Sequence, residues 1–261
     1  MQQIKIYITM KILQNFRNAW VKATTLGFFS FLLMIPISFL FTGLFHPLQS
    51  EGLTLAEIFN QTMDKSPMEF GWVFFIASQL GHFILYVIVG TVLSHLQYKV
   101  LKEYIPNKLK WTFLTILGLE LVLLGDLFYA GLSTGGAPGP LEPLLLGLGG
   151  GGLIALMQFL YLRSRGIKSA KWVGWWILGI ATGILTSIIF IFTYEYFLID
   201  SIKQAVSPMA FLVIDWLSFI LPYFTLIGFF AGLFSAKPLY RSLQQLKFIK
   251  DENESHFKRK K

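Results

Sequence analysis

The sequence predicts an all-α membrane protein built as a bundle of six transmembrane helices. Hydrophobic residues make up 54% of the 261 residues and charged residues only 14%, whereas a soluble domain carries about 25% charged residues. The apolar residues gather in blocks of about twenty, the length that crosses ~30 Å of hydrocarbon. Basic residues gather between alternate blocks, as they do beside cytoplasmic helix ends.

Six blocks have the length of a membrane span. Backbone groups in lipid must be hydrogen-bonded within their own segment, and the polar–apolar alternation of a β-barrel is absent from the sequence, so each block is expected to be a helix. The expected spans are Thr24–Phe45, Glu69–Ser94, Trp111–Leu132, Leu141–Leu162, Trp172–Leu198 and Met209–Ser235.

The distribution of charge orients these spans. Lys65 and Lys203 are the only two of the 22 Lys and Arg residues outside the N-terminal segment, the second and fourth connections and the C-terminal tail. The positive-inside rule therefore places both ends of the chain in the cytoplasm. The net charge of +8 then reflects membrane orientation rather than nucleic-acid binding. The sequence has no cysteine, which excludes disulfides, thiol catalysis and cysteine metal sites.

The two ends of the chain are basic. Residues 1–23 are expected to form an amphipathic helix on the cytoplasmic leaflet, where anionic lipid headgroups attract its basic side chains. Its apolar residues at helical spacing are Ile12, Leu13, Phe16, Ala19 and Trp20. The first apolar block ends without a small-x-small cleavage site and is interpreted as a retained span. Residues 24–235 form the transmembrane domain, and residues 236–261 form a basic cytoplasmic tail that is expected to be unstructured beyond Lys250.

The connections on the outer side are less basic. The first, residues 46–68, is acidic, and its capping-box pair Thr54 and Glu57 predicts a short surface helix. The favoured interpretation of this helix is an amphipathic connector, and the alternative is a lid or docking site. The third connection, residues 133–140, consists of turn-forming residues.

The chain also matches itself at an offset of 61 residues. Each copy has a helix ending Gly-x6-Gln-x4-(Lys/Arg), a basic connection, and a helix beginning Trp-x6-Gly. The matching positions are Gly90, Gln97, Lys102, Trp111 and Gly118 in the first copy and Gly151, Gln158, Arg163, Trp172 and Gly179 in the second. The pattern predicts a duplicated helical hairpin in parallel orientation. The first span carries Trp20-x6-Gly27 and the last carries Gly228 and Gly232 without a matching Gln, so these spans resemble half-units. Coincidence is the alternative, because Trp and basic residues are common at membrane edges.

This pattern resembles a group of uncharacterised bacterial, notably cyanobacterial, multi-pass membrane proteins. In that group a Gly-rich helix ends Gln-x-x-x-Leu-(Arg/Lys) and the next helix begins near a Trp. The matching segments here are Gly151–Gly179 and a weaker copy at Gly90–Gly118, about a quarter of the chain. The resemblance implies a bacterial inner membrane, or a thylakoid membrane for a cyanobacterial source, and implies no activity.

Small residues four apart let helix backbones approach closely. Such rows predict one compact bundle, with a hinge or pore lining as the alternative for residues 147–152. The rows are Ala77 and Gly81; Gly147, Gly151 and Ala155; Gly179, Gly183 and Ser187; and Gly228, Gly232 and Ala236. Pro36 and Pro222 are expected to kink the first and last spans.

Three acids lie within the expected spans: Glu120, Asp126 and Asp215. An ionised acid at mid-bilayer costs ~3 kcal/mol on insertion scales, so each is expected to face the interior with a partner. By depth, Glu120 lies near His82, and Asp126 lies near Asp215. Ser78 and Gln79 share a face with His82. This candidate polar cluster suits proton or solute transfer, and the alternative is a structural or interfacial role.

The sequence predicts no metal site and no cofactor. His82 is the only His deep in a span, which argues against a bis-His haem. Gln97 and Gln158 are expected to bond neighbouring backbone. No hydrolase or metalloprotease motif occurs, so an enzyme is not expected. Two functions remain: a non-catalytic accessory, assembly or scaffolding component with membrane-protein partners, and a small-solute or proton-coupled transporter that uses the intramembrane acids.

Overall fold

The computed structural model describes residues 2–33, 36–37, 72–132, 142–167 and 169–259. All elements in these ranges are helical, which confirms the all-α fold class. They are α1 (Gln2–Phe29), a 3-10 turn η1 (Ser30–Leu33), α4 (Trp72–Leu101), α5 (Lys108–Leu132), α6 (Glu142–Ser164), α7 (Lys171–Phe197), α8 (Ile199–Ala205) and α9 (Pro208–Arg259).

Within the described ranges, three segments are long and apolar enough to cross a membrane: Gln79–Leu101, Lys171–Phe197 and Ile220–Gln245. Length and composition thus support a membrane protein. Residues 34–35 and 38–45 of the expected first span lie outside the described residues, as do the surface helix near Thr54 and the turn at 133–140.

The two basic ends differ from expectation. Helix α1 runs without a break from Gln2 to Phe29, across the expected boundary at residue 24. Phe16 and Trp20 are buried within the protein, whereas Ile12 and Ala19 are exposed, so only part of this apolar face packs on other helices. Helix α9 is 52 residues long and continues to Arg259, and the expectation of an unstructured tail beyond Lys250 is therefore wrong. Pro222 lies inside α9, which continues past it.

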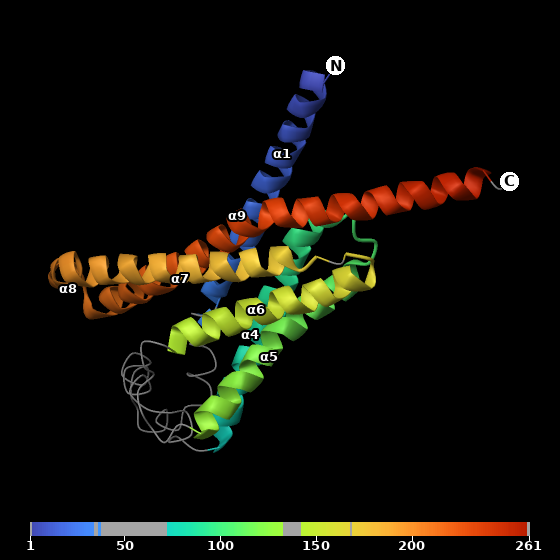
Figure 1. Cartoon of the computed structure of the whole chain (residues 1–261). Helices are drawn as coiled ribbons and strands as arrows, with labels where there is room; N and C mark the ends of the chain where they lie inside the picture. Colours follow the sequence, from blue (N-terminus) through green and yellow to red (C-terminus); the bar gives the residue numbers. More distant parts are fainter. Residues whose placement is uncertain (1, 34–35, 38–71, 133–141, 168, 260–261) are drawn as a thin grey trace.

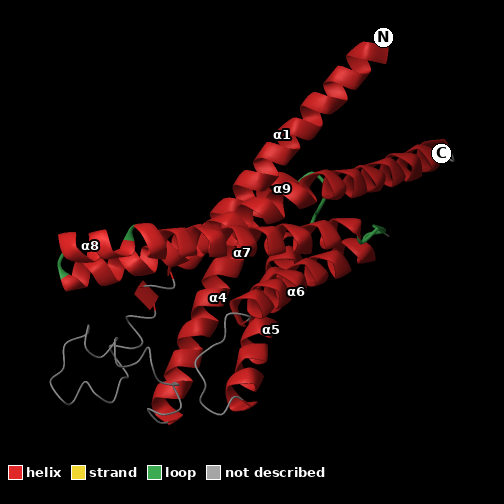
Figure 2. Ribbon diagram, turned by 60° about the vertical axis from the view of Figure 1, so that its left-hand side comes forward, coloured by secondary structure: helices red, strands yellow, loops and turns green. Residues whose placement is uncertain are grey.

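The helices are arranged as a closed ring. Each of α1, α4, α5, α6 and α7 packs against the next long helix along the chain, and α9 packs against both α7 and α1. Figure 1 shows α9 lying along α7 and crossing α1. The first turns of α1 and the last turns of α9 project beyond the other helices, and the pair α4–α5 diverges from the pair α7–α9 (Figures 1 and 2).

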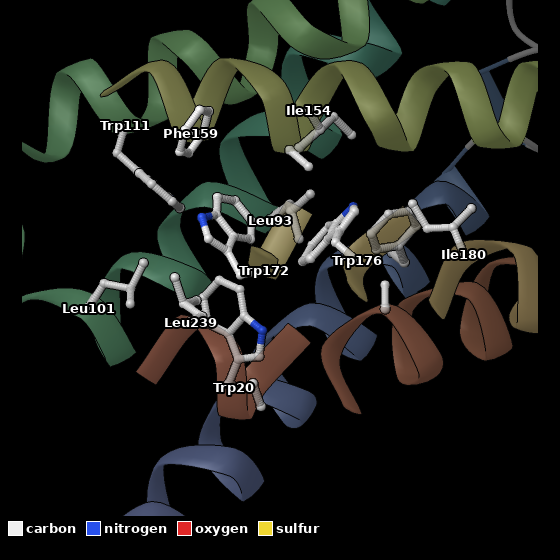
Figure 3. Packing of buried hydrophobic residues seen from close by; sticks show 14 of the residues in the cluster. Trp20, Leu93, Leu101, Trp111, Ile154, Phe159, Trp172, Trp176, Ile180 and Leu239 are labelled. Carbon is white, nitrogen blue, oxygen red and sulfur yellow. The ribbon is translucent and has the colours of Figure 1, made fainter. Parts of the chain in front are cut away.

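Four tryptophans fill the centre of the ring. Trp20 of α1, Trp111 of α5, and Trp172 and Trp176 of α7 are all fully buried, and Figure 3 shows them converging with Leu93 and Ile154. The ring centroids of Trp176 lie 6.2 Å from those of Trp20 and 6.4 Å from those of Trp172. The core therefore joins helices from both ends and the middle of the chain.

Candidate functional site

A hydrogen-bonded group of buried polar side chains lies between α4, α5 and α6. The side-chain amide of Gln158 donates to the side-chain oxygen of Gln97 at 2.8 Å and to the hydroxyl of Thr115 at 2.9 Å. The Thr115 hydroxyl in turn donates to the Trp111 carbonyl at 2.9 Å. All three side chains are 0% exposed. We call Gln97, Thr115 and Gln158 the Gln–Thr cluster.

The Gln–Thr cluster corrects one expectation from the sequence. Gln97 and Gln158 bond each other, not the neighbouring backbone. One turn before Gln97, the hydroxyl oxygens of Ser94 and Thr112 lie 3.0 Å apart, which adds a second polar contact between α4 and α5. Thr115 was missed by sequence reasoning, although it lies one helical turn after the repeated Trp111.

Two buried indoles also bond across helices. Trp20 Nε1 donates to the Ser235 hydroxyl at 3.0 Å, joining α1 to α9. Trp176 Nε1 donates to the Gly151 carbonyl at 3.0 Å, joining α7 to α6. Ser235 also donates to the Ala231 carbonyl within α9. The two indole hydrogen bonds thus join pairs of helices through polar groups that are buried inside the protein.

Several buried polar atoms around the centre of the ring have no hydrogen-bond partner in the described part of the chain. They are Thr24 Oγ1, Gln97 Nε2, Trp111 Nε1, Gln158 Oε1 and Trp172 Nε1. Leaving such an atom unbonded costs about 1–3 kcal/mol. These atoms comprise three nitrogen donors, one amide oxygen and one hydroxyl, and each can form a further hydrogen bond.

The structure describes the side chains of only some residues of the candidate polar cluster. Glu120 of α5 and His82 of α4 are each half-buried, and Glu120 Oε1 has no hydrogen-bond partner among the side chains that the structure describes. Gln79 Oε1, on the same helix as His82, also lacks one. Asp126, Ser78 and Gly147 lie in helices, but the surroundings of these three residues are not described. The pairing of Asp126 with Asp215 therefore stays a prediction.

The small-residue rows lie where helices meet. A methyl group at Gly183 of α7 would lie 2.5 Å from the Cα atom of Ile227 in α9, and one at Gly232 of α9 would lie 2.9 Å from that of Val21 in α1. Ala155 and Ala236 are fully buried. Around Gly149 of α6, by contrast, the space is open.

The described residues contain no group of three or more His, Asp or Glu side chains that could hold a metal ion. Comparison with protein-family models, with curated proteins and with solved structures found no match. The geometry of the site is thus the basis for a functional interpretation.

Proposed function

We propose that this protein is a non-catalytic accessory, assembly or scaffolding component of a membrane. The Gln–Thr cluster carries the proposal. Its polar side chains are fully buried and bond one another between three helices, as polar groups do when they hold membrane helices together. The described core offers packing and hydrogen bonds rather than reactive groups.

The proposal includes six spans with both ends in the cytoplasm. Helices α5, α6 and α7 agree within three residues with three of the expected spans, α4 extends seven residues past the expected end of the second, and α9 begins one residue before the sixth. The bias of Lys and Arg toward alternate connections supports the orientation.

Two surfaces support contact with lipid and with membrane proteins. Lys11, Arg17 and Lys22 are exposed on α1, where they suit anionic lipid headgroups. Leu185 and Ile189 on α7 are 56% and 67% exposed, so this apolar face suits acyl chains or a helix of a partner.

The test is affinity purification of the tagged chain, at its native expression level, in a mild detergent. The scaffold proposal predicts a partner membrane protein at fixed stoichiometry that is absent when an unrelated six-span protein carries the same tag. Cross-links to the partner should include the exposed face of α7. A chain that is solitary in detergent and in cross-linked native membranes would contradict the proposal.

A transporter is the second candidate function, and one observation favours it. Within the described part of the chain, Glu120 Oε1 is buried without a hydrogen-bond partner, as a proton-carrying acid in a membrane helix can be. A transporter predicts that Glu120→Gln abolishes solute or proton flux into proteoliposomes, while the exposed control Glu195→Gln retains it. Equal flux in both variants would remove this candidate.

A further inference from the structure

The two ends of the chain carry the same spacings as the two internal hairpins when α9 is placed before α1. In α4 and α6, Gln follows a buried Gly by seven residues, and in α9 Ser235 follows Gly228 by seven. In α5 and α7, Gly follows Trp by seven residues, as Gly27 follows Trp20 in α1. The residue that breaks the pattern in α9 is thus a Ser in the place of a Gln.

Contacts between successive hairpins are equivalent. The glycine of each Trp-x6-Gly motif packs on the first helix of the next hairpin. Its contact there is the residue three positions after the buried Gly of that helix. A methyl group at Gly27 would lie 2.9 Å from the Cα atom of Leu93, one at Gly118 2.7 Å from that of Ile154, and one at Gly179 2.6 Å from that of Ala231. These three contacts join α1 to α4, α5 to α6, and α7 to α9.

Contacts within each hairpin are equivalent too. Gly90 of α4 lies against Leu119, Gly151 of α6 against Ile180, and Gly228 of α9 against Phe28. Each of these partners lies eight residues after the Trp of its own hairpin. The α9–α1 pair therefore packs at the same register as the other two, although its helices are at opposite ends of the chain.

We propose that α9 and α1 together form a third copy of the hairpin, so that the ring consists of three equivalent units and is closed by the pairing of the chain ends. The inference goes beyond the proposed function and does not depend on it. We call the contact between two successive hairpins a seam. At the seam of α5 and α6, Gln158 bonds Thr115. The inference assigns a new role to Thr24, Trp176 and Ser235, because they occupy the equivalent positions at the other two seams.

The seam of α5 and α6 shows what that contact is, because Gln158 donates to Thr115 there. The corresponding pair at the seam of α1 and α4 is Gln97 and Thr24, and both Gln97 Nε2 and Thr24 Oγ1 are buried without a hydrogen-bond partner among the described residues. By equivalence, we expect a hydrogen bond between these two side chains. Thr24 is therefore the positioning residue for Gln97, as Thr115 is for Gln158.

At the third seam, between α7 and α9, a larger residue replaces the Thr and a smaller residue replaces the Gln. Trp176 stands where the other seams have Thr, and Ser235 stands where they have Gln. Both are fully buried, and Trp20 touches both, through its bond to Ser235 and its ring contact with Trp176. The larger residue on α7 and the smaller residue on α9 change the packed volume in opposite directions, so the two replacements partly compensate.

A volume exchange tests the third seam. Trp176→Thr alone should open a cavity and Ser235→Gln alone should overpack, so each should lower the folding equilibrium constant in detergent. The folding equilibrium constant of the double variant should be at least about threefold higher than the value expected from the two single variants if their effects were additive. This is the scale of coupling between side chains in contact. The control pairs Trp176→Thr with Ser187→Gln, since Ser187 is also buried, and should be additive. A double variant that is merely additive, or that does not fold, overturns the equivalence.

A double-mutant cycle with smaller changes in side-chain volume tests the seam of α1 and α4. Thr24→Val and Gln97→Leu should be coupled, as should Thr115→Val and Gln158→Leu, each measured by helical circular dichroism during reversible detergent unfolding. Thr91 bonds the Val87 carbonyl on an exposed face, so Thr91→Val with Gln97→Leu should show no coupling. Additivity of Thr24→Val and Gln97→Leu would overturn the role of Thr24.

Discussion

The amide of Gln158 donates a hydrogen bond of 2.8 Å to the side-chain oxygen of Gln97, and the two residues are 61 positions apart. They occupy the same place in two matching segments of sequence. The bond joins α4 to α6, which are separated along the ring by α5. A polar side chain that recurs in the sequence thus meets its own counterpart in the core.

Replacing Gln158 should destabilise the fold. Gln158→Leu removes two donated hydrogen bonds and leaves Gln97 Oε1 unbonded, which should cost about 1–3 kcal/mol of unfolding free energy. The double variant Gln97→Leu/Gln158→Leu should recover part of that loss, because both polar partners are then apolar. Reversible unfolding in mixed micelles measures both. Gln14→Leu on the exposed face of α1 is the control, and a Gln158→Leu variant as stable as this control would contradict the prediction.

Glycines at helix contacts and in open space should respond in opposite directions. A methyl group at Gly179 would lie 2.6 Å from the Cα atom of Ala231, whereas one at Gly174 on the same helix meets no atom within 4 Å. Gly179→Ala should therefore lose about 1–3 kcal/mol through overpacking. Gly174→Ala should gain up to about 1 kcal/mol from helix propensity. Size-exclusion chromatography after heating compares the soluble fraction, and equal behaviour of the two variants would argue against close packing of α7 on α9.

Orientation in the membrane can be measured directly because the chain has no cysteine. Single cysteines at the exposed positions Lys203 and Lys102 should label differently with a membrane-impermeant maleimide. Lys203→Cys should react in intact cells, and Lys102→Cys only after permeabilisation. Labelling of both positions from the same side would exclude the proposed arrangement of spans.

Tyr104 should make stability depend on alkaline pH. It lies between α4 and α5, and burial chiefly raises the pKa of its phenol above 10.0, with Tyr240 and Glu103 adding to the shift and a hydrogen bond to Gln244 opposing it. The raised pKa means that the fold favours the neutral phenol, so its contribution is complete below pH 10 and is lost as pH rises through the folded pKa. In the Tyr104→Phe variant, the free energy of unfolding should therefore fall less steeply with rising pH above 10, as measured by thermal unfolding. An unchanged slope would show that other groups govern this pH dependence.

The sequence predicts the bounds of α5, α6 and α7 to within three residues, because apolar length is a property of local composition. It does not predict which faces meet. The offset of 61 residues indicates that Gln97 and Gln158 are equivalent, but equivalence along a chain says nothing about contact, so their bond was missed. Phe16 and Trp20 have the spacing of a leaflet-binding face, and the same spacing suits a face packed on α9. Local pattern cannot separate lipid from protein as the apolar partner.

The most extensive helix contacts in the described chain are those of α9 with α7 and with α1, and α9 follows every other described helix in the sequence. During synthesis, the faces of α1 and α7 that pack on α9 therefore stay uncovered until α9 has been made. A chain truncated before α9 would leave both of these apolar faces without their partner. Synthesis of α9 is thus the step that completes the ring of helices.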